Sequence, residues 1–340
     1  MRDVARRAGV SSATVSRVIN GSPLVRPDTA EAVRRILDEV GFIPNPHATT
    51  LKYGRSKTFG LIVPDICNPF FAEFLGAFEH LLRQIDYEIL FTNIEGDDKL
   101  VASVRRMLMR QVDGAVLMAS EFDTKAIEPL LLHNVPLVTV DRKVVHAGCS
   151  DVAIDFEMGF DQAVHHLKEL GHREIGFIGG TEGLKTSRVR FEAFRKAILH
   201  HKLTFREEYV GVGNYRVDGG DQAVRTLWEK RRRPSALLTA NDLTAYGVIR
   251  GLHHLGVAVP TDVSVVGLDD ILLSHVMQPE LTTIRIPRQR MATACLEALN
   301  YTRQDVQRRG VRISVPTEFM VRESTAKPVR PPKGPSGKRS

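Results

Sequence analysis

Apolar residues in the first 40 positions of this 340-residue chain recur at the three- and four-residue spacing of amphipathic helices. The pattern predicts three helices, over Asp3–Ala8, Ser12–Asn20 and Pro27–Val40. A glycine ends the first and the third, and a Gly-Ser-Pro turn ends the second. Three short helices of this kind predict a small all-α module at the start of the chain.

From Thr58 the pattern changes to short apolar runs that alternate with amphipathic helices, such as Phe71–Gln84 and Asp242–Leu255. The runs predict buried strands over Thr58–Val63, Glu88–Thr92, Gly114–Met118, Leu137–Val140, Ile175–Gly179, Tyr209–Val212, Ala236–Thr239 and Val263–Gly267. Repeated strand–helix units are typical of parallel, doubly wound sheets. They fall into two sets, about 59–157 and 160–283, which predicts two α/β lobes with a ligand cleft at the carboxyl ends of the strands.

Two further segments lack a core-forming pattern. His47–Lys57 is polar apart from Leu51 and Tyr53, which indicates a linker or a marginal helix too short to be stable alone. Thr325–Ser340 is rich in proline, lysine and glycine, and we expect it to be a disordered tail.

Composition excludes several classes of protein. With 43% hydrophobic and 26% charged residues, the chain can bury a sizeable core. No apolar run reaches about 18 residues, and the charged start lacks an apolar signal segment. The three cysteines, Cys67, Cys149 and Cys295, form no C-x-x-C pair. We therefore expect a cytoplasmic protein with free thiols, without a disulfide framework or a zinc ribbon.

Charge is distributed unevenly. Residues 1–58 hold 10 Lys/Arg against 5 Asp/Glu, and residues 325–340 hold 5 Lys/Arg and no acidic residue. Because the whole chain carries +7, the part between them is slightly acidic. A basic N-terminal module on a mildly acidic body indicates that the module contacts a polyanion.

The first two predicted helices, joined by Ala8-Gly9-Val10-Ser11, have the spacing of a helix-turn-helix. Ser11 or Ser12 can cap the second helix. Such a helix lies in a major groove, where Arg17 can form a bidentate contact with guanine. The alternative is a three-helix packing module on which Arg17 is only a solvated charge. The outward face of the second helix holds Ser12, Ala13, Ser16, Arg17 and Asn20.

Ordered motifs extend this pattern along the chain. The first is Asp3-Val4-Ala5-x-x-Ala8-Gly9-Val10-Ser11-x-x-Thr14-Val15-Ser16-Arg17-Val18-Ile19-Asn20-Gly21. Others are Gly41-Phe42-Ile43-Pro44-Asn45-x-x-Ala48-x-x-Leu51, Gly60-Leu61-Ile62-Val63-Pro64-Asp65-x-x-Asn68-Pro69-Phe70-Phe71, Leu170-Gly171-His172-Arg173-x-Ile175, Ala240-Asn241-Asp242, Val259-Pro260-x-Asp262-Val263-Ser264-Val265-Val266-Gly267-x-Asp269-Asp270 and Leu281-Thr282-Thr283-Ile284. Together they resemble the lactose/galactose repressor (LacI/GalR) family of bacterial transcription regulators over all but the tail.

The resemblance implies a helix-turn-helix head and a two-lobed α/β core like that of periplasmic binding proteins. It implies a repressor that binds a near-palindromic operator DNA as a homodimer, with an affinity controlled allosterically by a small effector. The implied parts are a head at 1–45, a hinge helix at 46–57, a core at 58–324 (first lobe about 58–158 and 287–316, second lobe about 159–286 and 317–324) and the tail at 325–340.

The resemblance also implies that Pro46–Tyr53 folds into a hinge helix in the minor groove, where Leu51 wedges into the central base step. Without the family, Leu51 would be taken for a stray apolar residue of a linker. Ser12 and Ala13 occupy the positions that vary with operator sequence. The implied DNA contacts are Ser11, Ser12, Ala13, Thr14, Ser16, Arg17, Asn20, Asn45, Ala48 and Leu51.

Three departures from the family pattern concern local geometry. The chain starts at Met1-Arg2-Asp3, where members usually have a capping threonine before an apolar residue, so either a cap is missing or the start is misassigned. Arg26 stands where serine commonly caps the third helix. Ala193 replaces a glycine of the core. None of these positions is an implied base contact.

By their places in the family, eight residues near strand ends are implied effector contacts: Asp65, Phe70, Asp141, Arg142, Arg190, Tyr215, Asn241 and Asp269. Carboxylates, amides and arginines pair with vicinal hydroxyls, and aromatic rings stack on a sugar. Alternatives remain, with Asp269 and Asn241 as helix caps, or Asp141 and Arg142 paired with each other. Leu184 stands where a purine-binding member has a charged residue, which favours a sugar over a purine or nucleoside acting as a corepressor.

Other classes of protein fit less well. The glycine-rich Gly176–Gly183 does not match G-x-G-x-x-G, so we expect neither an enzyme nor a cofactor. A free sugar-binding protein would not carry the basic head. The adjacent pairs His165-His166, His200-His201 and His253-His254 diverge by about 100° on a helix, and we expect no metal to be chelated by them.

Overall fold

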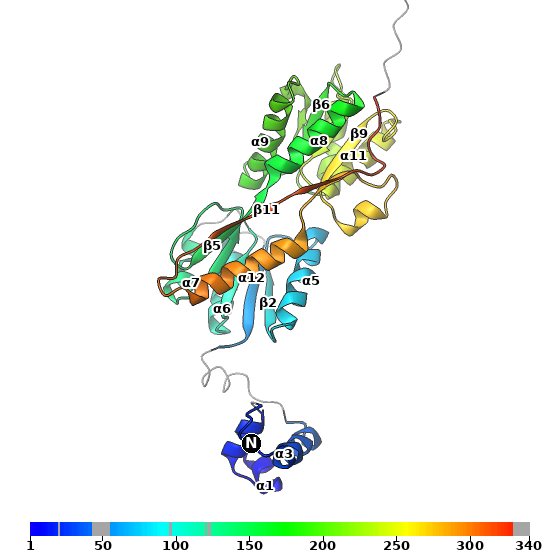
Figure 1. Ribbon diagram of the computed structural model, residues 1–340. Helices are drawn as coiled ribbons and strands as arrows, with labels where there is room; N and C mark the ends of the chain where they lie inside the picture. The colour runs from blue at the N-terminus through cyan, green and yellow to red at the C-terminus, as the bar shows by residue number, and fades with distance from the viewer. Residues whose placement is uncertain (20, 43–54, 95–96, 120, 122–123, 329–340) are drawn as a thin grey trace, which may run out of the picture. The chain divides into compact units, whose positions relative to one another are not determined.

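The computed structural model describes residues 1–19, 21–42, 55–94, 97–119, 121 and 124–328. The chain divides into two compact units, Met1–Ser56 and Lys57–Ser340 (Figure 1). Each unit has its own hydrophobic core.

The first unit consists of three helices, α1 (Arg2–Arg7), α2 (Ser12–Ile19) and α3 (Pro27–Glu39). All three lie within one or two residues of the predicted bounds. Their core is small and aliphatic: Val4, Ala5, Val15, Val18, Ala30 and Val33 are buried. Neither Met1 nor Arg26 makes a side-chain hydrogen bond as the N-cap of its helix. The helices therefore depend on packing and on the Gly9 turn, whose φ of +61° suits glycine.

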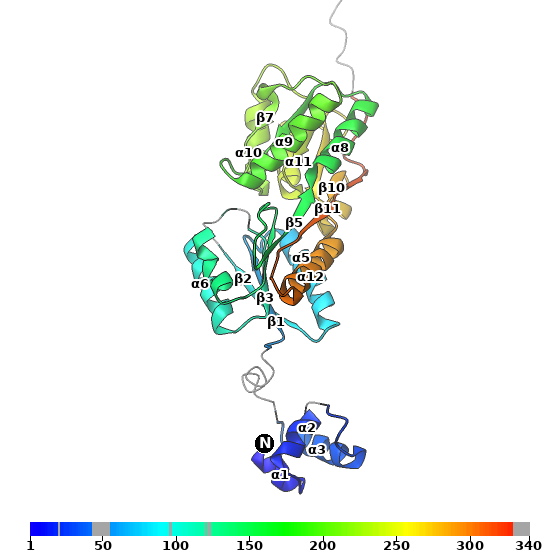
Figure 2. The ribbon, with the colours of Figure 1, turned by 60° about the vertical axis from the view of Figure 1, so that its left-hand side comes forward.

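The second unit contains two six-stranded sheets with helices on both faces, which confirms the doubly wound architecture (Figures 1 and 2). The first sheet has the order β11-β5-β4-β3-β1-β2, and all its pairs are parallel. Its strands are β1 (Thr58–Val63), β2 (Glu88–Asn93), β3 (Gly114–Leu117), β4 (Leu137–Val140), β5 (Cys149–Asp155) and β11 (Arg312–Pro316). One face packs on α5 (Pro69–Arg83) and α12 (Arg288–Gln304), the other on α6 (Asp97–Met109), η1 (Thr124–Ala126) and α7 (Glu128–Leu132).

The second sheet has the order β12-β10-β9-β8-β6-β7. Only β12 runs antiparallel to its neighbour among these described strands. The strands are β6 (Ile175–Ile178), β7 (Val210–Gly211), β8 (Ala236–Thr239), β9 (Ser264–Asp269), β10 (Thr283–Arg285) and β12 (Glu318–Met320). One face packs on α8 (Phe156–Leu170) and α9 (Lys185–His200), the other on α10 (Val217–Trp228) and α11 (Asp242–His254), and the turns η2 (Glu207–Tyr209) and η3 (Leu272–His275) complete the lobe.

The chain passes between the two lobes three times, from β5 to α8, from β10 to α12 and from β11 to β12. The crossings are tied together near Asp155, whose side chain caps α8 through Met158 N at 3.2 Å. Thr317 Oγ1 donates to Asp155 O at 2.7 Å. Two of the crossing segments are therefore joined by a hydrogen bond where they leave the first lobe.

Four strands, β5, β10, β11 and β12, were absent from the sequence prediction, and the strand predicted at Tyr209–Val212 has only two residues. In β5 the polar residues Ser150 and Asp151 hide the apolar pattern, although both side chains are buried. Thr302 satisfies Ser150, at 2.6 Å between the hydroxyl oxygens, and Thr139 donates to Asp151 at 2.8 Å. At Tyr209–Val212 the chain forms a 3-10 turn followed by the two-residue strand β7.

The sequence prediction placed the start of the disordered tail at Thr325, but the structure describes ordered contacts beyond that residue. Ala326 N donates to Ser264 Oγ at 3.0 Å, and His172 Nε2 lies 2.9 Å from Ala326 O. The backbone of Ala326 is thus held by buried polar groups of the second lobe. Residues 329–340 lie outside the described part of the chain.

None of the helices in the described part of the chain combines the length and the apolar character needed to span a membrane.

We expect Gly247→Ala to lower the free energy of unfolding of the core by about 1–3 kcal/mol, as overpacking typically does. Helices α10 and α11 approach through glycines, and a Cβ on Gly247 would overlap the main-chain oxygen of Val217. Urea unfolding measures the change. The control is Gly76→Ala in α5, where no other atom lies within 4 Å of the added Cβ. It should raise stability by up to about 1 kcal/mol, and equal effects of the two changes would contradict the close approach.

Candidate DNA-reading helix and ligand cavity

Helix α2 presents a polar face and a buried face. Val15 and Val18 are buried in the core of the first unit, while Ser12, Ala13 and Arg17 are exposed. The N-cap is Ser11, whose Oγ accepts from Thr14 N at 3.1 Å. The sequence left open whether Ser11 or Ser12 caps the helix. Ser11 is the cap, and Ser12 is exposed on the helix surface.

The other implied DNA contacts differ in position. Thr14 and Ser16 are half-buried, and Thr14 Oγ1 lies 2.9 Å from Ser11 Oγ, so the hydroxyl of Thr14 is engaged in the cap. Asn20, Asn45, Ala48 and Leu51 lie outside the described residues. Arg17 is exposed in the last turn of this helix, and base reading by it stays a prediction.

A cavity of about 370 Å³ lies in the second unit, lined by residues of both lobes. It is of the size that encloses a small metabolite. Six of the eight implied effector contacts line it: Asp65, Phe70, Asp141, Arg190, Tyr215 and Asp269. They come from the ends of β1, β4 and β9 and from the beginnings of α5, α9 and α10.

Asp269 is the most perturbed group in this cavity. It ends β9 with only 2% of its surface exposed, and its φ of +122° is rare for a residue with a side chain. Its Oδ1 atom has no hydrogen-bond partner among the described residues. Burial raises its pKa to about 8, against the opposing charge of Arg190. A carboxyl group in this condition is ready to accept a hydrogen bond from a ligand.

Arg190 provides the complementary group. Its Nη1 donates to Ala240 O at 2.6 Å, and its guanidinium lies 5.1 Å from the ring centre of Phe156 and 5.3 Å from that of Tyr215. Its Nε is buried without a partner among the described residues. Two residues that line the cavity thus hold one buried donor and one buried acceptor without partners among the described residues, and both are costly to leave unpaired.

Two further cavity residues have left-handed backbone conformations, Asp141 with φ +57° and Tyr215 with φ +64°. Asp141 Oδ1 accepts from Ile154 N at 2.7 Å. Burial raises the pKa of Asp141 to about 6, although that hydrogen bond opposes the change. Such backbone conformations cost energy and concentrate at functional sites.

Arg142 and Asn241 do not line the cavity. Arg142 N donates to Asp151 Oδ1 at 3.0 Å. Asn241 caps α11, because its Oδ1 accepts from Thr244 N at 2.9 Å. Its Nδ2 donates to Tyr215 O at 3.0 Å, so Asn241 positions Tyr215.

Several cavity residues were not singled out from the sequence, among them Asn68, Phe71, Thr186, Asn214 and Arg216. Arg216 is the clearest case, because its Nη2 lies 2.8 Å from Asp65 Oδ2 in the opposite lobe. A second bond across the cleft runs from Lys185 Nζ to Arg142 O at 2.7 Å. Their positions beside predicted strand ends and helix starts were the available signal.

Family models match parts of both units of the chain. Residues 1–45 match the family model "Bacterial regulatory proteins, lacI family", and residues 164–325 match "Periplasmic binding protein-like domain". Catabolite control protein A of Priestia megaterium is 32% identical over 95% of this chain and 98% of its own. The HTH-type transcriptional repressor PurR of Pectobacterium carotovorum subsp. carotovorum (strain PC1) is 33% identical, over 88% of this chain and 89% of its own.

Solved structures give the same picture. The Lac repressor dimer bound to operator and the anti-inducer ONPF matches with a TM-score of 0.85 at 26% identity, over 95% of this chain and 98% of the other. A complex of the transcriptional regulator CelR with cellobiose matches with a TM-score of 0.70 at 30% identity, over 94% and 98%. The chain therefore belongs to the lacI family of bacterial regulatory proteins, and it is a DNA-binding transcriptional regulator rather than an enzyme.

Proposed function

We propose that this regulator binds a small polyhydroxylated effector, a sugar, in the cavity between its lobes, and that the effector controls its affinity for operator DNA. The observation that carries the proposal is the pair of buried unsatisfied atoms, Asp269 Oδ1 and Arg190 Nε, on two residues that line the cavity. A sugar hydroxyl can donate to the first and another can accept from the second. Phe70 and Tyr215, which also line the cavity, offer aromatic faces for a pyranose or furanose ring.

A purine or nucleoside is the second candidate effector. It is favoured by the similarity to repressors named PurR and by the same aromatic residues, on which a base can stack. Against it stands Leu184, an apolar residue in the cavity wall just before α9. Two regulators among the similar structures contain sugars, cellobiose in one and ribose in the other. We therefore rank a sugar first.

The proposed control depends on movement of the lobes. The bonds from Arg216 to Asp65 and from Lys185 to Arg142 O cross the cleft, so their geometry changes when the lobes open or close. In a homodimer on a near-palindromic operator, that movement would alter how two heads and two hinge segments meet the DNA. A coupling of about 1–3 kcal/mol corresponds to a change of about 5–150-fold in operator affinity. The protein would act in the cytoplasm, where the operator lies.

Arg17→Ala tests the DNA-reading helix. Loss of a bidentate guanine contact should weaken binding to a selected operator by about 1–3 kcal/mol and relax the preference at one base pair of each half-site. Electrophoretic mobility shifts on an operator selected from a random pool, at a fixed salt concentration, measure this. Arg35→Ala removes an equal charge from the exposed surface of α3 and should affect specific and nonspecific DNA alike. The same loss in both variants would contradict base reading by Arg17.

Asp269→Asn tests the effector site. With an inducing or corepressing sugar found by screening mono- and disaccharides, the wild type should show the affinity change given above. The variant should lose most of it, because an amide NH₂ group replaces one of the two carboxyl oxygens that can accept from the ligand. Operator affinity without sugar should be similar in both proteins. Purine bases and nucleosides belong in the same screen. A response to purines alone would replace the sugar proposal, and a full response in the variant would remove Asp269 from the site.

The same variant has a pH signature. In the folded protein the pKa of Asp269 is about 8 against an ordinary value of 3.8, so the carboxyl destabilises the fold progressively as the pH rises from about 4 to 8. The melting temperature of Asp269→Asn, compared with that of the wild type without effector, should therefore be higher by a few °C at pH 8. The difference should be much smaller at pH 5. A gain that is the same at both pH values would show that the carboxyl is not desolvated.

A further inference from the structure

Helices α8 and α9 lie side by side on the outer face of the second lobe (Figures 1 and 2). Polar side chains bridge the exposed seam between them. The first bridge is an ion pair, with Lys196 Nζ 2.5 Å from Glu157 Oε1. One helical turn further along, Asp161 on α8 faces His200 at the end of α9. At this second bridge, two histidines take the place of the single lysine.

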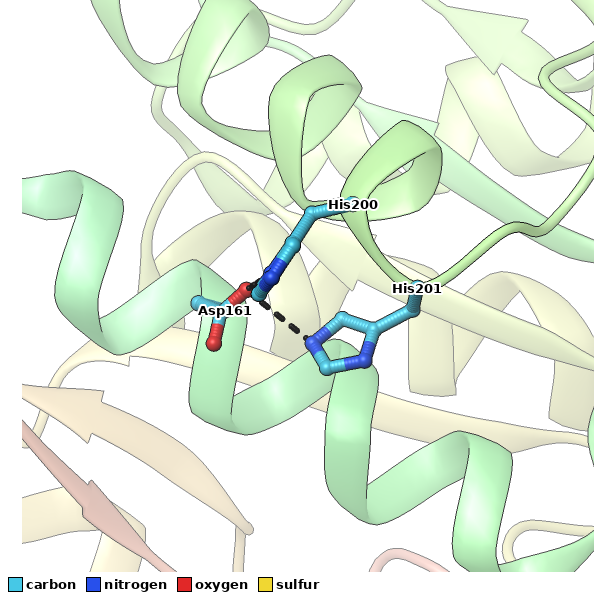
Figure 3. A group of neighbouring side chains, drawn as sticks. All are labelled: Asp161, His200 and His201. Carbon is cyan, nitrogen blue, oxygen red and sulfur yellow. Dashed lines mark hydrogen bonds and ion pairs between the residues drawn. The ribbon is translucent and has the colours of Figure 1, made fainter.

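Both imidazoles converge on one carboxylate oxygen (Figure 3). His200 Nδ1 lies 2.6 Å and His201 Nε2 lies 3.0 Å from Asp161 Oδ1. One ligand atom from each of the three residues can be chosen so that all lie within 4.8 Å of one another. Zinc binds nitrogen at about 2.0–2.1 Å and oxygen at about 2.0–2.2 Å. Small side-chain rotations would bring the three donor atoms to these distances from one ion.

The sequence-based expectation that adjacent histidines diverge does not hold for this pair. His200 is the last residue of α9, and His201 lies beyond it as the C-cap, with φ −80° and ψ 8°. His200 uses its near nitrogen and His201 its far nitrogen, which compensates for their different directions. The carboxylate arrives from another helix and meets both.

We propose that Asp161, His200 and His201 form a surface site for a divalent transition-metal ion of the zinc class. Two imidazoles and a carboxylate are the donor set that Zn²⁺, Co²⁺ and Ni²⁺ share. His165, exposed and one turn along α8 from Asp161, has its ring centre 5.4 Å from that of His201 and is a candidate fourth ligand. With the side chain of His200 71% exposed, the ion has an open path to the site.

The electrostatics of the cluster are consistent with metal binding. Burial alone would raise the pKa of Asp161, but the hydrogen bonds and charges of His200 and His201 outweigh it and lower that pKa. Asp161 is thus a carboxylate at neutral pH, the form in which it ligates a metal. At the neighbouring bridge the carboxylate of Glu157 is paired with one cation, Lys196, whereas Asp161 meets two imidazoles.

A bound ion would cross-link α8 to α9. Helix α8 begins directly after the first crossing between the lobes, and α9 carries Arg190 into the effector cavity three turns before His200. The ion would therefore fix the outer layer of the second lobe. Because the ion binds the folded chain, it should raise the melting temperature with its concentration.

The test uses the full-length protein without a polyhistidine tag, stripped with a chelator and then titrated with ZnCl₂ or CoCl₂. We expect one saturable site by calorimetry and a rise of about 5 °C in melting temperature at a hundredfold excess over Kd. Bound Co²⁺ should give visible ligand-field bands without a thiolate charge-transfer band. That band would indicate the exposed Cys67 instead and would overturn the proposal.

Variants locate the site. Asp161→Asn and the double change His200→Gln with His201→Gln should each weaken Zn²⁺ binding about tenfold or more, since even outer-shell changes cost that much. Lys196→Gln on the same seam and His253→Gln in another adjacent histidine pair are matched controls and should bind as the wild type does. The site is contradicted if the wild type does not bind Zn²⁺. It is also contradicted if the double variant binds Zn²⁺ as tightly as the wild type. The wild-type titration is decisive even if a variant folds poorly.

Discussion

A buried carboxyl group where the two lobes meet, with one oxygen left without a hydrogen-bond partner among the described residues, is the constraint on which the rest of the core depends. Asp269 and Arg190 are kept from water by aromatic and aliphatic walls, and neither satisfies the other completely. The cost is borne by two well-packed sheets with extensive apolar cores. The unpaired atoms raise the free energy of the ligand-free protein. A ligand whose hydroxyls pair with them therefore binds more favourably, because pairing removes this penalty.

Much of the fold followed from periodicity, and the exceptions have clear physical causes. Apolar runs of four to six residues predicted the central strands of both sheets, since parallel strands buried on both faces are almost entirely apolar. Strand β5 escaped because Ser150 and Asp151 are polar, and their burial is made possible by partners distant in sequence, such as Thr302. The start of the tail was predicted too early for a similar reason, because Ala326 forms hydrogen bonds with Ser264 and His172. No local pattern encodes such partners.

The sites show the same division. The two faces of α2 could be assigned from spacing alone, and Ser11 was one of two capping candidates. Asn241 illustrates the ambiguity of an asparagine before a helix, which can cap the helix or contact a ligand, and here it caps α11. The bond from Arg216 to Asp65 could not be predicted, because the two residues lie 151 positions apart in the sequence. The convergence of His200 and His201 on Asp161 was not expected, because a separation of about 100° applies within one continuous helix, whereas α9 ends between the two residues.

The three crossings between the lobes have a consequence for synthesis of the protein. The first lobe is discontinuous in sequence, because β5 pairs with β11, and α12 packs between β11 and α5 in its core. As the chain leaves the ribosome, this lobe must wait for the second to emerge before its own last strand and helix arrive. The edge of β5 and the apolar face that α12 covers are meanwhile open to mispairing. Most of the second lobe is therefore an insertion in the sequence of the first lobe. Its folding brings the early part of the first lobe close to the later α12 and β11.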